Sequence, residues 1–117
     1  MPPVKSSDIK GIALQFTEAL TDRDYSKAYA MVSSEYRNRM SLDKMKLDFE
    51  SIVPSDWGPI VSIEIGTTLE NWPDKQPSDL GWAYVSIGGD VYSEGVTVVI
   101  TLEDGEAKIC AVEFGRP

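Results

Sequence analysis

The sequence predicts a single α+β domain in which N-terminal helices pack on a strongly curved antiparallel sheet. Two patterns predict this class. Apolar residues recur at helical spacing as far as Pro54, and from Asp56 onwards they alternate with polar ones, which is typical of strands. The length of 117 residues is that of about one domain. We therefore expect residues 1–117 to form one unit, with residues 1–6 as a flexible N-terminal segment.

Three helices are expected in the first half of the chain. Residues 8–20 carry apolar side chains at helical spacing. A shorter helix follows, with Asp24 as its N-cap, because a short side-chain oxygen can accept an unpaired backbone amide. Segment 33–40 has a mixed pattern, which fits either a helix end or a loop. Ser41 opens the third helix, and Pro54 ends it because the residue before a proline is pushed out of the helical region.

Four strands are expected in the second half, at residues 60–69, 81–87, 91–103 and 106–114. The third is the richest in β-branched side chains, which favour strands. Asp104-Gly105 predicts a tight hairpin, because a type I′ turn needs positive φ at both central residues. The segment 71–79 is rich in proline and charge, so we expect a loop there.

The sequence contains no histidine and one cysteine, Cys110. These absences exclude Ser-His-Asp and Cys-His catalysis, histidine-ligated zinc and an internal disulfide. We expect no metal, no cofactor and a buried, unreactive thiol. The single thiol favours the cytoplasm, and an exported protein with its leader removed is the alternative. No apolar stretch reaches the ~18 residues of a membrane span.

The net charge of −8 lies entirely in the second half of the chain. Residues 1–50 contain eight acidic and eight basic side chains, whereas residues 51–117 contain eleven acidic and three basic ones. An acidic surface repels phosphate groups, so nucleic acid is not the expected partner. A basic protein partner suits this charge, and simple solubility explains it equally well.

Two segments of the sequence resemble those of a known family. Residues 19–25 (ALTDRDY) end one helix and lead into the short helix 27–32 (KAYAMV), and the chain closes with the hairpin 98–109 (VVITLEDGEAKI). Together they resemble the nuclear transport factor two-like superfamily, which includes ketosteroid isomerase. The resemblance implies a cystatin-like cone with a pocket between helices and sheet, and a homodimer formed through the sheets. Catalytic members use a pocket Asp with Tyr or His, and no such residue can be carried over here.

Two sets of residues are candidates for binding. Aromatic rings could line the pocket of the cone and bind a small apolar ligand; these are Tyr29, Trp57, Trp82 and Tyr84. Core packing is the alternative for Tyr29 and Trp82. Acidic and aromatic residues near one end of the sheet could bind a basic protein; these are Trp72, Asp74, Asp79, Asp90, Tyr92 and Glu94.

Three classes of function remain open. We expect a non-catalytic module that binds or inhibits a partner protein through the acidic, aromatic end of the sheet, for example an immunity-type protein. A small-molecule binder and an isomerase- or cyclase-like enzyme that uses Asp and Tyr are the alternatives. No catalytic residue is assigned, because no polar motif in the sequence converges on one place. The strand face with Thr97, Val99 and Thr101 must be either solvated or buried in a dimer.

Overall fold

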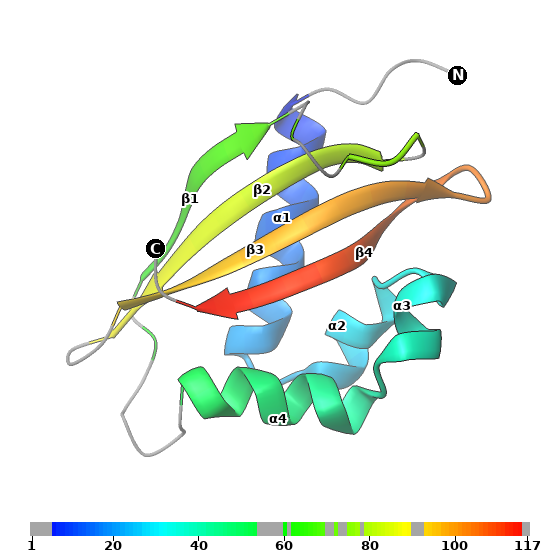
Figure 1. Ribbon diagram of the computed structural model, residues 1–117. Coiled ribbons are helices and arrows are strands. Elements are labelled where there is room, and N and C mark those ends of the chain that lie inside the picture. The colour runs from blue at the N-terminus through cyan, green and yellow to red at the C-terminus, as the bar shows by residue number, and fades with distance from the viewer. Residues whose placement is uncertain are drawn as a thin grey trace.

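The computed structural model describes residues 6–53, 60, 62–69, 72, 75–77, 79–89 and 93–115, and of residues 6–8 and 115 the backbone alone. In this part of the chain, helices pack against a four-stranded antiparallel sheet, which confirms the α+β class (Figure 1). The helices are α1 (Ser6–Thr21), α2 (Tyr25–Ala30), α3 (Ser34–Arg39) and α4 (Leu42–Ile52). The strands are β1 (Ser62–Leu69), β2 (Asp79–Gly88), β3 (Ser93–Glu103) and β4 (Glu106–Gly115). None of the described helices is both long and apolar enough to cross a membrane.

The helix starts follow from local hydrogen bonds. The predicted caps are confirmed, since the side chains of Asp24 and Ser41 each accept a backbone N–H from the first turn of α2 and α4. Ser33 caps α3 in the same way, so the segment of mixed pattern is a helix. Helix α1 begins at Ser6, within the segment expected to be flexible, and residues 1–5 lie outside the described part.

The strands follow one another in the sheet in chain order, each antiparallel to the next. The hairpin between β3 and β4 has the predicted geometry, because Asp104 and Gly105 have φ values of 52° and 81°. Strand β2 begins at Asp79, which was expected to belong to the preceding loop. The bounds of all four expected strands differ from the observed ones by two residues or fewer at either end.

The core lies between α1 and one face of the sheet. Alternate side chains of β2 and β3 are fully buried on this face; these are Ala83, Val85, Val96, Val98 and Ile100. Phe16 and Leu20 of α1 are equally buried, and α1 crosses behind the sheet in Figure 1. Gly81 gives α1 its close approach, because a Cβ there would be 2.8 Å from Ile9. The candidate site lies on the opposite face of the sheet.

Three β-bulges interrupt the sheet, at Gly66, Leu80 and Cys110, one in each pair of neighbouring strands. The bulge in β4 sets Cys110 and Ala111 together against Val99 of β3. It also reverses the alternation of the strand, so that Val112 lies opposite the buried Val98. Cys110 and Val112 therefore lie on opposite faces although they are two residues apart, because the bulge adds one residue to the strand.

Part of the outer edge of β4 is covered by the segment between α2 and α3. Ser33 donates its N–H to the carbonyl of Ile109 at 2.8 Å, and Ile109 donates its N–H to the carbonyl of Met31 at 2.9 Å. The guanidinium of Arg39 donates to the carbonyl of Cys110 at 2.6 Å. These contacts place α3 alongside β4, at the margin of the exposed face of the sheet.

Candidate functional site

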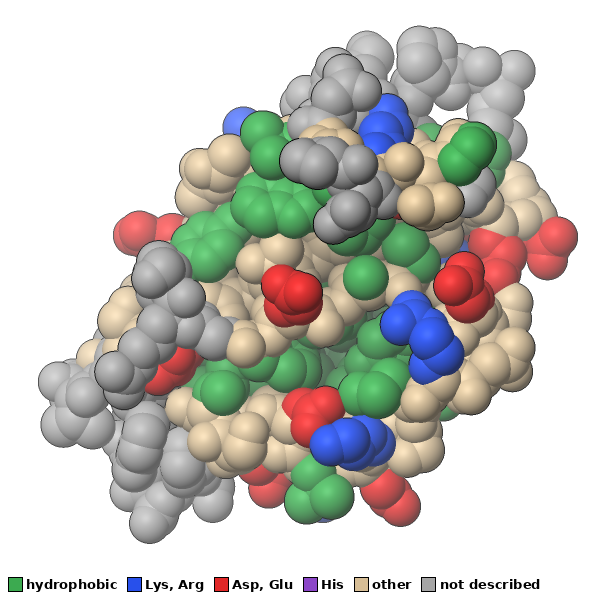
Figure 2. Space-filling view, viewed as in Figure 1, with side chains coloured by type: hydrophobic (Ala, Val, Ile, Leu, Met, Phe, Trp, Pro, Cys, Tyr) green, Lys and Arg blue, Asp and Glu red, His purple; other side chains and the backbone are tan. Residues whose placement is uncertain are grey.

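An open groove of about 480 Å³ lies on the sheet face opposite α1. Its floor consists of outward side chains of β3 and β4, among them Thr97, Val99 and Ala111. Figure 2 looks onto this face and shows hydrophobic side chains exposed between acidic and basic ones, with a hollow near the middle. The pocket implied by the family resemblance lies between the helices and the sheet, so this groove is in a different place.

The two sides of the groove differ in chemistry. On the side of β2 it is lined by aromatic and polar residues, namely Trp72, Gln76, Asp79 and Trp82. On the side of β4 it is lined by Glu35 and Arg39 of α3, and Glu113 stands at the margin. Three carboxylates and one guanidinium of the described residues therefore surround a floor of both apolar and threonine side chains. This combination suits an occupant with both an apolar and a cationic part.

A polar contact bridges β2 and β4 within the groove. The thiol of Cys110 donates to Oδ1 of Asp79 at 3.6 Å, and Oδ2 of Asp79 accepts the N–H of Gln76 at 2.9 Å. Thr101 of β3 lies between these two strands and is only 7% exposed. Burial raises the pKa of the Cys110 thiol to about 12, and the charge of Asp79 adds to this effect. The thiol is therefore protonated and unreactive at neutral pH.

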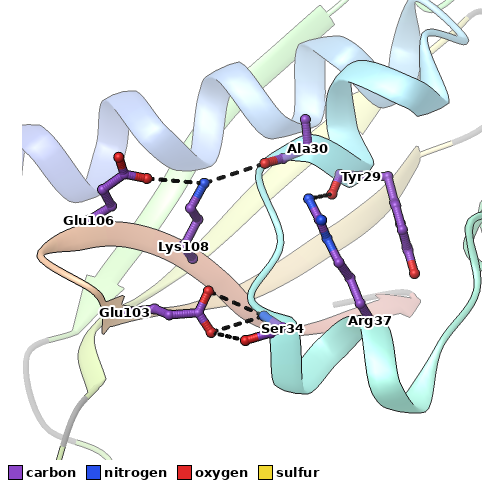
Figure 3. A network of polar contacts seen from close by, with 7 residues as sticks. All are labelled: Tyr29, Ala30, Ser34, Arg37, Glu103, Glu106 and Lys108. Carbon is purple, nitrogen blue, oxygen red and sulfur yellow. Dashed lines mark hydrogen bonds and ion pairs between the residues drawn. The ribbon is translucent and has the colours of Figure 1, made fainter.

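The α3 side of the groove is held by a polar network (Figure 3). The carboxylate of Glu103, at the end of β3, accepts hydrogen bonds from both the N–H and the hydroxyl of Ser34 at the start of α3. These bonds lower the pKa of Glu103 below its ordinary value. Lys108 adds a long contact of 3.5 Å to the carbonyl of Ala30. The hairpin and α3 are thus fastened together.

The groove joins residues that were assigned to different sites. Trp72 and Asp79 were expected to bind a protein and Trp82 a small ligand, and all three line the same groove. Four further candidates, Trp57, Asp74, Asp90 and Tyr92, lie outside the described residues.

The remaining candidates, Tyr29, Tyr84 and Glu94, are not among the residues that line the groove. The hydroxyl of Tyr29 donates to the carbonyl of Met40 at 2.7 Å, which fits the alternative that Tyr29 packs in the core. Tyr84 packs its ring against Gly66 and Gly95 on the exposed face of the sheet. Glu94 lies opposite Ile87 on the side of the sheet that faces the helices, and it is only 5% exposed.

Sequence patterns missed the contribution of α3. Glu35 and Arg39 reach the groove because α3 lies along β4, and the hydrogen bond from Arg39 to Cys110 joins residues 71 positions apart. No local pattern encodes a contact between such distant positions. The pairing of Glu113 with Thr97 places Glu113 on the groove side of the sheet.

A tyrosine and a carboxylate do meet elsewhere in the molecule. Tyr25 donates its hydroxyl to Oε2 of Glu50 at 2.9 Å, and it accepts a bond from Arg23 at 3.3 Å. Arg23 also donates to the carbonyl of Val53 at the end of α4 and lies over the ring of Phe49. These contacts tie the turn after α1 to α4, outside the groove. Among the described residues, no three Cys, Asp or Glu side chains are grouped so that they could hold a metal ion.

No known protein family, curated protein or solved structure matches the chain. Its function is therefore argued from the geometry and charge of the groove.

Proposed function

We propose that this chain is a non-catalytic binding module and that the groove on its exposed sheet face receives a basic partner protein. The single observation that carries the proposal is the composition of the groove. Two tryptophans, Trp72 and Trp82, stand beside three carboxylates, and among the described residues one basic side chain, Arg39, lines the same surface. Aromatic rings supply contact area with little loss of side-chain freedom, and complementary charge speeds encounter and selects the partner.

The charge of the whole chain supports a basic partner. Residues 51–117, which supply the sheet, carry the entire net charge of −8. The cation in the groove, Arg39, is engaged with its own chain through the carbonyl of Cys110 and the ring of Tyr36. The negative charges of Glu35 and Glu113 lie on exposed side chains. An immunity-type protein that neutralises a basic toxin is one concrete form of this function.

Photo-crosslinking can test the proposal. A benzophenone side chain at Thr97, in the floor of the groove, is compared with one at Leu47, which is 65% exposed on α4. After irradiation in an extract of the native host, we expect basic proteins to be joined to the Thr97 probe and not to the Leu47 probe. Equal crosslinking at both positions contradicts a groove-specific partner.

Charge reversal supplies the second arm of the test. Glu35→Lys combined with Glu113→Lys reverses two exposed charges at the groove, and Asp22→Lys combined with Asp43→Lys makes the same change on the exposed helical surface. We expect the first pair to abolish the crosslink and the second to leave it unchanged. If both pairs act alike, net charge and not the groove governs binding.

A small-molecule binder is the second candidate, on the strength of the groove volume. About 480 Å³ falls within the range of ligand pockets, and Val99 and Ala111 give the floor apolar surface. Titration of an aromatic ligand library against the fluorescence of the tryptophans would detect such a ligand. Saturable quenching that is lost in Trp82→Ala supports this candidate, and quenching that survives the substitution places the ligand elsewhere.

The homodimer, the family and the cellular location also stand as proposals. The order of elements, helices followed by four antiparallel strands, supports a cone-shaped member of the nuclear transport factor two-like superfamily. An experimental structure that lacks the cone would contradict it. A homodimer formed through the exposed sheet face would cover the groove and so compete with a partner there, and it would have about twice the chain mass of 12.9 kDa in light scattering. The single thiol supports a cytoplasmic location, which cell fractionation can test.

A further inference from the structure

The positions of Asp79 and Trp82 along β2 define a small subsite within the groove. Asp79 lies opposite Thr101 and Trp82 opposite Val99, and these two residues of β3 are two positions apart on the same face. Such neighbours on a strand are separated by roughly 7 Å. The bulge at Leu80 absorbs the extra residue, so the carboxylate and the indole are neighbours on the exposed face.

The carboxylate of this subsite is fixed in orientation. Its two oxygens accept hydrogen bonds from the N–H of Gln76 and the thiol of Cys110, one bond each. A carboxylate oxygen has two acceptor positions, so each oxygen of Asp79 retains one for a further donor. A donor group with two parallel N–H bonds could therefore use both oxygens at once.

One aromatic ring of this groove, Trp72, already has a cation of the same chain over its face. The ammonium of Lys75 lies 5.7 Å from the centre of the Trp72 ring. Indole is the aromatic side chain that attracts cations most strongly. Trp82 is half-buried in the groove. A flat cation that stacks on Trp82 can present its edge to the carboxylate of Asp79.

Guanidinium satisfies both requirements, because it is planar, permanently charged and carries five N–H donors in a fork that matches a carboxylate. We infer that the groove recognises an arginine side chain of the partner, held between the Trp82 indole and the Asp79 carboxylate. This inference rests on the proposed function and specifies the partner's contact residue. Lysine provides the same charge without the planar fork, so it binds more weakly at this subsite.

Short peptides that differ at one residue can test the inference on the full chain. Their central residue is arginine, lysine or citrulline, the last being a neutral analogue of arginine with nearly the same shape. The indole N–H signals of Trp72 and Trp82 are followed by NMR during titration to about 10 mM, since single side chains bind in the millimolar range. We expect the arginine peptide to bind with at least about threefold higher affinity than the lysine peptide, as judged from the Trp82 signal. The citrulline peptide should leave that signal unchanged.

Asp79→Asn with Asp22→Asn as the matched control tests the role of the carboxylate. We expect the arginine preference to disappear in the first variant and to persist in the second, in which an exposed carboxylate away from the groove is changed. Equal shifts with citrulline and arginine overturn the inference, as does an unshifted Trp82 signal. The peptide panel on the unaltered chain decides the matter even if Asp79→Asn fails to fold.

The arginine subsite and the binding of a basic protein are tested independently. If the crosslink at Thr97 depends on the groove but the arginine peptide does not bind, the inference is overturned and the proposed function stands. If the arginine peptide does not bind and no crosslink depends on the groove, both the arginine subsite and the proposed function are overturned.

Discussion

The ring of Tyr84 lies directly against the backbone of Gly95 on the neighbouring strand, so closely that a Cβ at Gly95 would be 2.5 Å from the tyrosine oxygen. The same ring leaves little space at Gly66 on its other side, where a Cβ would be 2.9 Å from Cδ1. One side chain of β2 thus packs across both adjoining strands, and two glycines provide the space for it.

We expect Gly95→Ala to lower the free energy of unfolding by about 1–3 kcal/mol, because the added methyl group overlaps the Tyr84 ring. Gly11→Ala is the matched control, since nothing lies within 4 Å of a Cβ on that helical glycine. It should raise stability by about 0.5–1 kcal/mol. Urea denaturation measures both, and a Tyr84→Ala background should reduce the cost at Gly95.

The hydroxyl of Tyr84 is buried and has no hydrogen-bond partner among the described residues. A buried polar group without a partner costs free energy, so Tyr84→Phe should leave stability unchanged or raise it by up to about 1 kcal/mol. Tyr29→Phe should lower stability by about 1 kcal/mol, because it removes the bond to the Met40 carbonyl. Equal losses in the two variants would mean that the Tyr84 hydroxyl has a partner.

The bonds between Glu103 and Ser34 should make stability depend on pH. The pKa of Glu103 is lowered from 4.5 in the folded chain, so its contribution is fully present above that pH and is lost as the pH falls through the folded value. Glu103→Gln should therefore lower the melting temperature at pH 7 and have little effect in strong acid. Glu106→Gln serves as the control, because the Glu106 carboxylate is exposed and pairs with Lys108 at 3.3 Å instead of capping α3.

Cys110 should react slowly with alkylating reagents. With a pKa of about 12, roughly one thiol in ten thousand is ionised at pH 8, against about one in four for an ordinary thiol. We expect iodoacetamide to modify the folded chain at least about 100-fold more slowly than the urea-unfolded chain. Asp79→Asn should accelerate the reaction only in part, because burial is the larger cause of the raised pKa. Comparable rates for the folded and unfolded chains would contradict this view of the groove.

Elements set by local chemistry could be predicted from the sequence. Asp24 and Ser41 each bond to amides a few residues away, and Asp104-Gly105 requires a backbone shape that few other pairs adopt. The change from helical to alternating spacing located the boundary between helices and sheet. These features depend on near neighbours, which the sequence displays directly.

The groove depends on contacts that the sequence does not display. The bulges at Leu80 and Cys110 decide which side chains share a face, and each arises from the pairing of two strands. The side formed by α3 depends on hydrogen bonds between residues far apart in the chain. Trp72, Asp79 and Trp82 could be chosen as binding candidates, but their presence in one groove could not be predicted.

The covered edge of β4 has a further consequence. In the described part of the chain, Met31, Ser33 and Arg39 occupy backbone groups of Ile109 and Cys110 that a neighbouring strand would otherwise use. On the opposite side of the sheet, β1 pairs with β2. Fibril growth requires that each added copy offer a free strand edge to the next. Because Ile109 and Cys110 of β4 already have partners within the chain, we expect this edge of the sheet to resist pairing with a strand of another copy, and α3 contributes to that protection through Arg39.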